Sequence, residues 1–326
     1  MTSIVIPAHN EERVIGRLLD ALTAAGPPAD GPGALDVVVV CNGCTDATAR
    51  AAARPGVTVV EIPVPSKHAA LRAGDRHARG FPRVYVDADV EIDASGIRLL
   101  AEAVAPAGGV LAAAPARRLP TAGCVWRVRA YYRVWQLLPA VREGLFGRGV
   151  IALSEDGHAR IADLPPLMAD DLAVSLAFAP HERAVVPGAV ATVHPPRTWA
   201  DLIRRRVRAT TSTHQLEQHQ RADAEGAEPA AGRASTDAAG GGTSGGPAGV
   251  PAGVPAGGTA SGTARKPPSA RTSTADLRTL LLGRPWLLPH MTVFLAAAVV
   301  ARRKARAAVR AGDYGTWLRD ESSRTG

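Results

Sequence analysis

The sequence predicts an α/β protein in which helices cover a largely parallel β-sheet. Up to about residue 118, short apolar runs alternate with helical stretches four times over, which is the pattern of parallel sheets joined by crossover helices. In addition, the polar segments PAHNEE, CNGCTD and DAD each follow an apolar run or overlap its end. Because ligands of open α/β sheets bind beyond the carboxyl ends of the strands, we expect these three segments to form one site.

The individual elements follow from apolar patterns and end signals. The predicted strands are SIVIPA, DVVVVC, VTVVEIP, RVYVDAD and GVLAAAPA, and the helices between them are EERVIGRLLDALTAAG, TDATARAAARPG, SKHAALRAGDRHARG and ASGIRLLAEAVAPAGG. Gly26 and Pro27 end the first helix, Thr45 or Asp46 can cap the second, and Ser66 can cap the third. The end signals therefore agree with the alternation of strands and helices.

Length and composition indicate a globular chain of one to two domains. Its 326 residues are 46% hydrophobic, which is enough to bury a core. The formal net charge of +8 rests mainly on Arg, since Lys occurs only at positions 67, 266 and 304, and only two short basic clusters stand out. We therefore expect no nucleic-acid partner.

The three cysteines, Cys41, Cys44 and Cys124, indicate a reducing compartment. They are odd in number, and no signal peptide precedes the opening MTSIVIPAHN, so we expect a cytoplasmic protein. CNGC has the spacing of a metal or redox pair, but a structural zinc site needs four ligands and the chain has no second such pair. A redox pair remains the alternative interpretation.

The second half of the chain is less regular. Residues 119–220 contain an amphipathic aromatic helix, CVWRVRAYYRVWQLLPAV, a Gly-rich turn, GLFGRGVIALSEDG, and two further helices, PPLMADDLAVSLAFA and WADLIRRRVRATTSTHQL. The aromatic residues of the first helix recur at helical spacing, which is typical of a core. Residues 221–272 are rich in Ala, Gly and Pro and are predicted to be a disordered linker.

Residues 273–326 form a predicted helical carboxyl-terminal segment with an apolar centre. The apolar stretch 286–301 spans 16 residues and contains Pro289 and His290, whereas crossing a bilayer takes about 20 apolar residues. With the basic flank ARRKAR, this stretch fits a helix lying on an anionic membrane surface, at the inner face of the plasma membrane. A helix docked on the protein's own core fits equally well.

Asp87 and Asp89 are the first candidate site residues. They follow the strand VYV with one small residue between them. Two carboxylates at this spacing suit a hard divalent cation that also binds phosphate oxygens. An isolated Asp pair at a strand end can also cap backbone groups in a turn, so the spacing has to be weighed with the neighbouring motifs.

The ordered set of motifs resembles family 2 glycosyltransferases, which have the glycosyltransferase A fold. SIVIPAHNEE, VVVVCNGCTDAT, SKHAALRAGDRHARG, VYVDADV, MADDLAVSLAF and LIRRRVRATTS follow in the family's order over about residues 1–220. The resemblance implies a nucleotide-sugar-binding half at 1–118 and an acceptor-binding, catalytic half at 119–220. It also implies Mg²⁺ or Mn²⁺ as the cofactor and a nucleotide-diphosphate sugar as the donor.

In this resemblance, the first loop lines the nucleotide. Pro7, Ala8, His9 and Glu11 occupy the matching positions. A loop at a strand end presents both backbone and carboxylate groups to a ligand, which agrees with that role. A surface-loop histidine is the alternative interpretation of His9.

The second loop departs from the family's pattern. Asn42 stands where most relatives have the Asp that accepts from the base, and Cys41 and Cys44 replace the Asp and Ser of the usual DDGS. An Asn carbonyl can still accept a hydrogen bond but its amide also donates, so the base is left open. Asp46 either contacts the nucleotide or caps its own helix. Lys67 either contacts the phosphates or the ribose of the nucleotide, or is simply solvated.

The resemblance assigns the remaining roles. Asp87 contacts ribose or sugar and belongs with Asp89 and His194 to the metal site, although a lone His is more often a loop residue. Asp171 is the catalytic base, and Asp170 orients it or caps the helix. Arg205 and Arg208 clamp the diphosphate, but Ala follows Arg208 where the family has Trp, and a solvated or membrane-facing Arg run is the alternative.

Together these features predict a metal-dependent glycosyltransferase that moves a sugar to a hydroxyl acceptor, with inversion, in cell-wall, polysaccharide or glycolipid synthesis. A lipid-linked acceptor would agree with the apolar stretch 286–301. The alternatives are a retaining transferase of the same fold, of the glucosyl-phosphoglycerate type, and a degenerate membrane-associated scaffold. A nucleotidyltransferase or a dehydrogenase is disfavoured because no Gly-rich phosphate loop follows the first strand.

Overall fold

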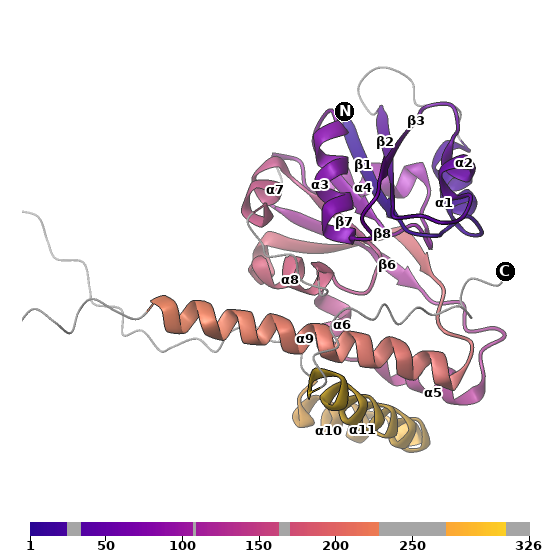
Figure 1. Ribbon diagram of the computed structural model, residues 1–326. Coiled ribbons are helices and arrows are strands. Elements are labelled where there is room, and N and C mark those ends of the chain that lie inside the picture. The colour runs from indigo at the N-terminus through magenta and orange to yellow at the C-terminus, as the bar shows by residue number, and fades with distance from the viewer. Residues whose placement is uncertain (25–33, 107–108, 163–169, 228–271, 311–326) are drawn as a thin grey trace, which may run out of the picture. The chain divides into compact units, whose positions relative to one another are not determined.

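The computed structural model describes residues 1–24, 34–106, 109–162, 170–227 and 272–310 (Figure 1). The chain divides into two units, one made of Met1–Leu216 with Ala270–Gly326 and the other of Glu217–Ser269. The first unit contains all the strands and the site described below. Most of the predicted linker, 221–272, lies outside the described residues, and the helix before it continues to Ala227.

One eight-stranded sheet organises the first unit, in the order β3-β2-β1-β4-β7-β6-β8-β5. Its strands are β1 (Thr2–Ala8), β2 (Leu35–Asn42), β3 (Val57–Ile62), β4 (Arg83–Val86), β5 (Val90–Glu91), β6 (Ala112–Arg118), β7 (Val150–Leu153) and β8 (Arg183–Val193). The predicted α/β class is therefore confirmed.

The two halves of this sheet differ in strand direction. β1 pairs in parallel with β2 and β4, and β2 pairs in parallel with β3, as the alternation of strands and helices predicts. Beyond β4, however, β7 is antiparallel to both of its neighbours and β5 is antiparallel to β8. The short strands β5 and β7 and the long strand β8 are not among the predicted strands, because their apolar runs are brief or interrupted by Pro and Gly.

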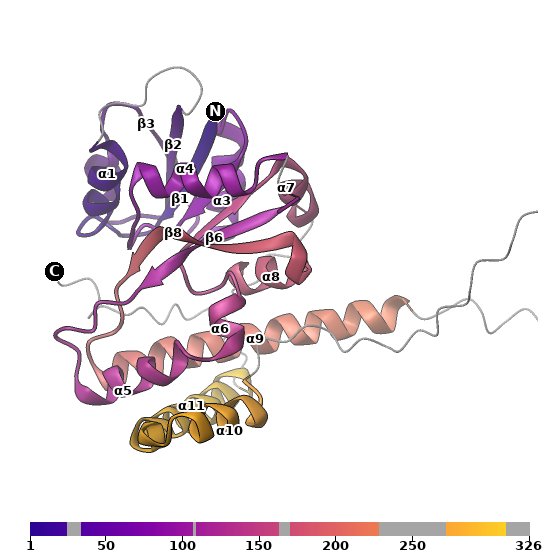
Figure 2. The same ribbon diagram turned by 180° about the vertical axis from the view of Figure 1, so that it is seen from behind.

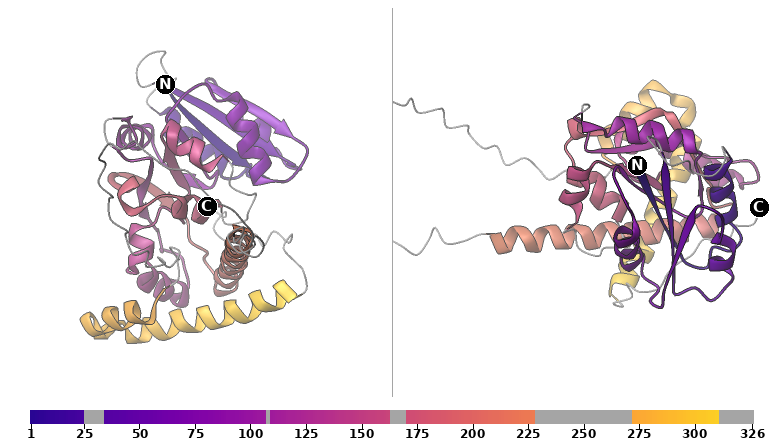
Figure 3. Two further views of the ribbon diagram at one scale, coloured as in Figure 1. Left: turned by 90° about the vertical axis from the view of Figure 1, so that its left-hand side faces the viewer. Right: turned by 90° about the horizontal axis from the view of Figure 1, so that it is seen from above.

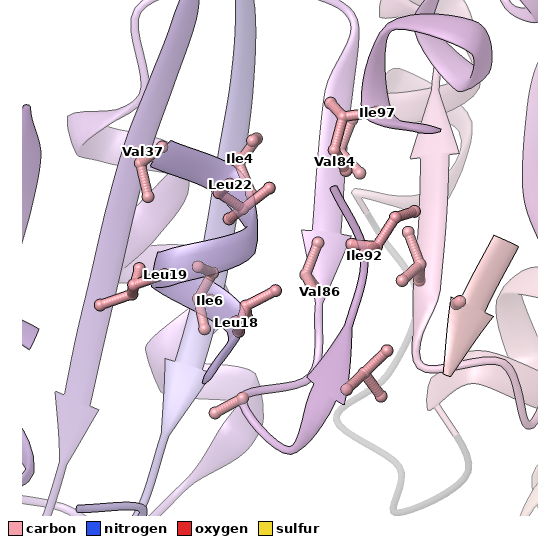
Figure 4. Packing of buried hydrophobic residues seen from close by; sticks show 14 of the residues in the cluster. Ile4, Ile6, Leu18, Leu19, Leu22, Val37, Val84, Val86, Ile92 and Ile97 are labelled. Atoms are coloured by element: carbon pink, nitrogen blue, oxygen red, sulfur yellow. The ribbon is translucent and has the colours of Figure 1, made fainter. Parts of the chain in front are cut away.

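Helices cover both faces of the parallel half. On one face lie α1 (Ile15–Thr23), α2 (Thr48–Ala52) and α4 (Ala94–Ala103), and on the other lies α3 (Lys67–His77). Figure 4 shows Leu18, Leu19 and Leu22 of α1 packed on Ile4 and Ile6 of β1, all at most 4% exposed. This 3.6-residue periodicity on the helix, facing alternate residues of the strand, is what the sequence pattern requires.

Helix α3 approaches the sheet closely at Gly74. A Cβ atom at this position would overlap Cγ1 of Val5 on β1. Ser66 caps the helix as predicted, with its side chain accepting from the Ala69 amide at 3.2 Å. These contacts fix the amino terminus of α3, where Lys67 lies, at the carboxyl end of the strands.

The second half of the chain is mostly helical. It forms α5 (Trp126–Trp135), α6 (Pro139–Glu143), α7 (Glu155–Ile161), α8 (Asp170–Ala177), α9 (Trp199–Ala227), α10 (Thr274–Gly283) and α11 (Leu288–Arg310). The single aromatic helix expected over CVWRVRAYYRVWQLLPAV is two helices, α5 and α6. Pro139 begins the second of them, because proline disfavours a helical residue before it and fits the first helical turn.

Helices α5, α9 and α11 pack on one another away from the sheet (Figures 1 and 3). Their buried cluster includes Tyr131 of α5, Val207 of α9, and Phe294 of α11, whose ring stacks on that of Tyr131 at 5.2 Å between centroids. In the described part of the chain, Pro285–Ala307 is the one segment long and apolar enough to cross a membrane, and 28% of its apolar window is buried. One face of α11 is thus docked on the protein.

Figure 2 shows α4 lying across the face of the sheet on this side of the molecule. Asp93 caps α4 and accepts from the Gly96 amide at 2.7 Å. The short segment from β4 to α4, which includes β5, therefore ends at a capped helix. This segment contains Asp87 and Asp89.

Candidate functional site

The carboxyl ends of β1, β2 and β4 meet at one edge of the sheet, which we call the rim. Ala8 of β1 lies beside Cys41 of β2 in the parallel register, so the loops that follow the two strands are neighbours. His9 Nδ1 donates to the Asn42 carbonyl at 2.6 Å, which joins these loops directly. The loops PAHNEE and CNGCTD therefore contact each other, as predicted.

Asn10 gives the first loop its shape. It adopts a left-handed φ of 53°, which Asn tolerates better than most residues, and its Oδ1 accepts from the Thr45 amide at 2.7 Å. Cys44 Sγ donates to the Ala8 carbonyl at 3.4 Å. The first and second loops thus hold each other in place through several hydrogen bonds.

Asn42 presents an oriented acceptor inside the rim. Its Nδ2 donates to the Ala8 carbonyl at 2.9 Å, and this bond fixes which way the amide points, because a carbonyl can only accept. Asn42 is 2% exposed, and its Oδ1 is buried without a hydrogen-bond partner in the described part of the chain. An unsatisfied buried acceptor is costly, so this oxygen is suited to a ligand N–H.

Asp46 and Glu11 anchor the loops to α2. Asp46 accepts from the Thr48 amide at 3.0 Å and from the Glu12 amide at 3.3 Å, and also bonds the Thr48 hydroxyl. Burial opposes ionisation, but these hydrogen bonds hold the Asp46 pKa below its usual value. The Glu11 amide donates to Thr48 Oγ1 at 2.7 Å, and Glu11 is 8% exposed. Capping contacts of Asp46 are therefore present, and its contact with a nucleotide stays a prediction.

Cys41 of CNGC does not have the character of a reactive thiol. Burial, and after it the neighbouring Cys44, raise the Cys41 pKa to about 12. All three cysteines are free. A reactive thiol needs a lowered pKa, so Cys41 stays protonated at neutral pH and fills the core behind the rim.

Lys67 and Asp87 form an ion pair at the rim. Lys67 Nζ lies 2.9 Å from Asp87 Oδ1, and the two side chains are 32% and 41% exposed. Two residues that the sequence places on different elements, the start of α3 and the end of β4, are thus brought together. The pair leaves both charges accessible to a ligand that carries phosphate and hydroxyl groups.

Asp87 and Asp89 lie in a short turn that follows β4. The Val90 amide donates to the Asp87 carbonyl at 3.2 Å, which closes this turn. Val86, Ala88 and Val90 are at most 4% exposed and belong to the core, whereas both aspartates are only half-buried. The two aspartates are therefore the more exposed residues of this segment.

His194 directly follows the end of β8. Val90 of β5 pairs with Val193 of β8 in antiparallel register, so His194 follows the strand that pairs with β5. His194 Nε2 donates to Glu91 Oε1 at 2.7 Å, since a carboxylate only accepts. In neutral His194 the proton is then on Nε2, and Nδ1 is the nitrogen that could bind a metal.

A Gly-rich loop at residues 144–149 connects the rim to Asp171. The Asp87 amide donates to the Gly149 carbonyl at 2.8 Å, and the Gly147 amide donates to Asp171 Oδ2 at 2.7 Å. Both glycines have positive φ, 65° at Gly147 and 67° at Gly149, and a Cβ on Gly149 would overlap Cγ2 of Val90. The sequence analysis treats this segment only as a turn. The two glycines flanking Arg148 could have indicated its importance.

Arg117 interacts electrostatically with Asp171, and two other arginines lie near Arg117. Arg117 of β6 donates to the Phe146 carbonyl at 3.0 Å and lies 4.4 Å from the centroid of the Trp135 ring. Burial, and then the charges of Arg148 and Arg205, lower the Arg117 pKa to about 9, while Asp171 acts in the opposite direction. Arg117 Nε is buried and lacks a hydrogen-bond partner among the described residues. Arg117 could not be predicted as a site residue from the sequence, because no motif surrounds it.

Arg148 has a structural role in the same loop. Its guanidinium donates to the carbonyls of Gly144, Pro115, Val141 and Arg142 at 2.8–3.1 Å. Burial lowers its pKa to about 10. It therefore holds the loop to β6 and α6 and contributes positive charge beside Arg117.

The arginines of the predicted basic motif, at 204–208, lie in different surroundings. Arg205 donates to the His194 carbonyl at 3.3 Å and lies near Arg117, so it belongs to the site. Arg204 pairs with Asp201, and the Arg206 guanidinium lies 5.9 Å from the centroid of the Tyr131 ring. The predicted role of Arg208 stays a prediction. The side chain of Asp170, the first residue of α8, lies outside the described side chains.

The residues that could hold a metal are few. Within the described residues, no group of three or more His, Cys, Asp and Glu side chains is gathered closely enough to hold an ion. Asp87 and Asp89 offer two carboxylates in the turn after β4. Mg²⁺ is commonly bound by one or two carboxylates together with the phosphates of a substrate, so the two aspartates fit a metal that arrives with its nucleotide.

Comparison with known proteins shows a similarity in the first half of the chain. Residues 3–157 match the model of the family described as Glycosyl transferase family 2. Over 94 residues, the chain is 38% identical to the 4,4'-diaponeurosporenoate glycosyltransferase of Staphylococcus aureus, a match that covers 27% of this chain and 24% of that protein. The chain thus spans about a quarter of the length of the curated relatives it matches.

A solved structure with a TM-score above 0.5 supports the fold. A mannosyltransferase from Pyrobaculum calidifontis, in complex with GDP-Man and Mn²⁺, has a TM-score of 0.51 and 22% identity, covering 99% of this chain and 84% of its own. The glucosyl-3-phosphoglycerate synthase of Mycobacterium tuberculosis has a TM-score of 0.44 and 21% identity, covering 59% of this chain and 70% of its own. The chain therefore shares the fold of this mannosyltransferase, and slightly less than half of it, residues 3–157, is similar to glycosyl transferase family 2.

Proposed function

We propose that the protein transfers a sugar from a nucleotide-diphosphate sugar to a hydroxyl acceptor in a metal-dependent, inverting reaction. The observation that carries this proposal is the buried, unpartnered Oδ1 of Asn42 at the same rim as the Lys67–Asp87 pair. A nucleotide bound at the rim would satisfy that acceptor with its base, and its ribose and phosphates would meet Asp87 and Lys67. Pro7, Ala8 and the loop after them would line the base.

The oriented Asn42 amide restricts the base. Because Nδ2 is used by the Ala8 carbonyl, Oδ1 accepts and cannot donate. Uracil, thymine and guanine carry an N–H at the centre of their pairing edge, whereas cytosine and adenine carry an acceptor there. We therefore expect UDP, dTDP or GDP sugars as donors rather than CDP or ADP sugars.

Asp89 and His194 are the proposed ligands of Mg²⁺ or Mn²⁺, with Asp87 beside them. Glu91 would hold the His194 ring through its bond to Nε2, as carboxylates commonly do behind a metal-binding histidine. A bound divalent cation supplies positive charge to the diphosphate as it leaves. Arg205, which bonds the His194 carbonyl, would add positive charge on the same side.

Asp171 is the proposed general base. Its Oδ2 is held by the Gly147 amide, which fixes the carboxylate relative to the loop that also bonds Asp87. As the acceptor oxygen attacks the anomeric carbon, its proton passes to Asp171 and the bond from that carbon to the diphosphate oxygen breaks. A single displacement of this kind inverts the anomeric centre. Arg117 would stabilise the charged groups at this point.

The acceptor is proposed to be lipid-linked and to reach the site from the cytoplasmic face of the plasma membrane. The exposed face of α11, which includes Leu295 and Val299 at 44% and 48% exposure, supports contact of 286–301 with a membrane surface. The similar Staphylococcus aureus protein is named for a carotenoid-type acceptor, which agrees with an apolar substrate.

Binding of UDP, dTDP, GDP, CDP and ADP, measured by calorimetry with and without Mn²⁺, tests the donor site. We expect at least one of the first three to bind, more tightly with the metal, and CDP and ADP to bind weakly. Failure of every nucleotide to bind under both conditions would overturn the proposal. The anomeric configuration of the product, read by NMR, then distinguishes inversion from the retention of a glucosyl-phosphoglycerate-type enzyme.

A further inference from the structure

Two segments of the chain contain no acidic residue at all. Residues 119–142 carry four Arg, and residues 277–310 carry seven Lys or Arg, but neither segment has an Asp or Glu. The whole chain, by contrast, has a net charge of only +8 with 30 acidic residues. Positive charge is therefore concentrated in these two segments, which are far apart in the sequence.

The fold brings the two segments together as a layer of α5, η3 (Pro285–Leu287) and α11, joined by the part of α10 that follows Asp276 (Figure 3). We call this the acid-free layer. Its inner side is the buried cluster of Tyr131, Phe294 and their neighbours. Its basic side chains described as exposed are Arg127, Arg129, Arg133, Arg142, Arg278, Arg284, Arg302, Arg303, Lys304, Arg306 and Arg310.

Large apolar side chains accompany these charges on the surface. Trp126 and Trp286 are 51% and 54% exposed, and Leu288, Leu295 and Val299 are 44–55% exposed. Positions 288, 295 and 299 share one face of α11, opposite the buried Phe294 and Ala301. Tryptophan with exposed aliphatic residues and cations is the composition of a surface that lies in the headgroup region of a bilayer.

A pocket opens in this layer between α5 and α11. It is lined by Thr121, Trp126, Arg129, Arg133 and Gln136, and by His290. The Arg133 guanidinium lies 5.3 Å from the centroid of the Trp286 ring, and the His290 ring lies between those of Trp126 and Trp286, at 6.4 and 6.2 Å. His290 Nδ1 is buried without a hydrogen-bond partner among the described residues. The pocket thus combines two cations with an unsatisfied ring nitrogen.

We propose that this pocket binds the phosphate group of an anionic membrane phospholipid, while Leu288, Leu295 and Val299 enter the acyl region beside it. Arg129 and Arg133 would pair with the phosphate, and Trp126 and Trp286 would lie at the level of the headgroups. The proposal deepens the membrane contact proposed above and rests on it. It concerns a face of the molecule other than the rim, so nucleotide binding tests it separately.

The cations and the exposed apolar side chains of the acid-free layer together favour an anionic phospholipid over other anionic partners. A nucleic acid would be attracted by the cations, but it would leave the exposed leucines of α11 in contact with water or phosphate. An acidic protein partner would leave the His290 pocket without a phosphate-sized anion. A bilayer that contains phosphatidylglycerol satisfies both kinds of side chain, and each Lys or Arg near such a surface adds to the attraction.

Binding to vesicles tests the proposal. The full chain is titrated with vesicles of phosphatidylcholine alone and of phosphatidylcholine with phosphatidylglycerol, at 0.15 M salt, and binding is followed by sedimentation and tryptophan fluorescence. The variants are Arg129→Gln with Arg133→Gln, and as a matched control Arg72→Gln with Arg98→Gln, two exposed arginines on α3 and α4. A third variant, Leu288→Ser with Leu295→Ser, removes the apolar contact.

We expect the wild-type chain and the Arg72, Arg98 control to prefer the anionic vesicles. The Arg129, Arg133 variant should lose about 30-fold in affinity for anionic vesicles, as expected for two cations near an anionic surface. The leucine variant should lose binding to both kinds of vesicle. A soluble probe, dihexanoyl phosphatidylglycerol below its micelle concentration, should change the tryptophan fluorescence of the wild type and not that of the Arg129, Arg133 variant.

Each other result overturns part of the proposal. If both arginine pairs reduce vesicle binding equally, the attraction is diffuse and the pocket is not a phosphate site. If the wild type binds neither kind of vesicle, or binds a single-stranded oligonucleotide more tightly than anionic vesicles, the membrane contact fails as well. Unchanged nucleotide binding and unchanged melting temperatures in the variants show that the proposed donor site and the fold are intact in either case.

Discussion

The rim and the acid-free layer use charge in opposite ways. At the rim, Lys67 meets Asp87 and His194 meets Glu91, so each of these charged or titratable side chains is matched by a partner from another element. In the acid-free layer, exposed cations are crowded together without a single carboxylate in the two segments. The side chains of the rim are thus held in place before a ligand with both phosphate and hydroxyl groups binds. The positive charge of the acid-free layer, by contrast, has to be neutralised by an anionic surface or molecule.

This difference has a functional consequence. Substitutions at the rim should change catalysis and nucleotide binding while leaving membrane binding as it is. Substitutions in the layer should do the reverse. The largest effects are expected for substitutions at the rim, and an unchanged activity there would weaken the distinction between the rim and the acid-free layer.

Asp171→Asn should have the largest effect on transfer. The amide cannot take the acceptor proton, and loss of general-base catalysis typically costs about 100- to 10,000-fold in rate. The measurement is the initial rate of sugar transfer, once a donor and acceptor have been found, with Asp156→Asn on α7 as a control that should stay within about twofold of wild type by its exposed position. A fully active Asp171→Asn enzyme would exclude this residue as the base.

Asp89→Ala should remove the metal's contribution to donor binding. We expect the Mn²⁺-dependent part of nucleotide binding to disappear and transfer to fall by about 100- to 1,000-fold, as for loss of one group that stabilises a leaving charge. Calorimetry with and without Mn²⁺ measures the first effect directly. Retention of metal-dependent binding in this variant would place the metal elsewhere.

Gly149→Ala should destabilise the loop that connects Asp87 to Asp171. The added Cβ would overlap Val90 Cγ2, and overpacking of this kind costs about 1–3 kcal/mol in the free energy of unfolding, in addition to the strain of a positive φ. Gly123→Ala is the matched control, because Gly123 also has positive φ but a Cβ there meets nothing within 4 Å. Urea denaturation should therefore show a larger loss at Gly149 than at Gly123.

Asn42→Ala should have the smallest effect, on the choice of base. Loss of one hydrogen bond to a ligand N–H lowers affinity by up to about tenfold. The affinity for UDP and GDP should fall while that for CDP, which presents no N–H at the same position, should change little. If all nucleotides lose affinity equally, Asn42 supports the loop rather than reading the base.

Local patterns were sufficient to predict most of the parallel half of the fold. The strands ending at Ala8, Asn42 and Val86 and the cap at Ser66 depend on apolar runs and hydrogen bonds between residues close in sequence. The D-x-D pair, Lys67 and the first two loops could be predicted for the same reason, with the help of the family resemblance. The base could not be predicted, because whether Asn42 accepts or donates depends on the Ala8 carbonyl of another strand, which orients the amide.

The remaining features depend on contacts between distant segments. Arg117 has no motif around it, and only the packing of β6 against the 144–149 loop brings it close to Asp171 and Arg205. The pairing of His194 with Glu91 likewise follows from the register of two short strands that no apolar pattern predicts.

The sequence by itself determined the α/β class, the parallel strands, the loops at their carboxyl ends and the absence of acid from residues 119–142 and 277–310. The tertiary structure decided that the 144–149 loop joins Asp87 to Asp171, and that α11 docks one face on α5 and leaves the other exposed. The physical reason is that periodicity and end signals are local, whereas which surfaces bury each other depends on the packing of the whole chain.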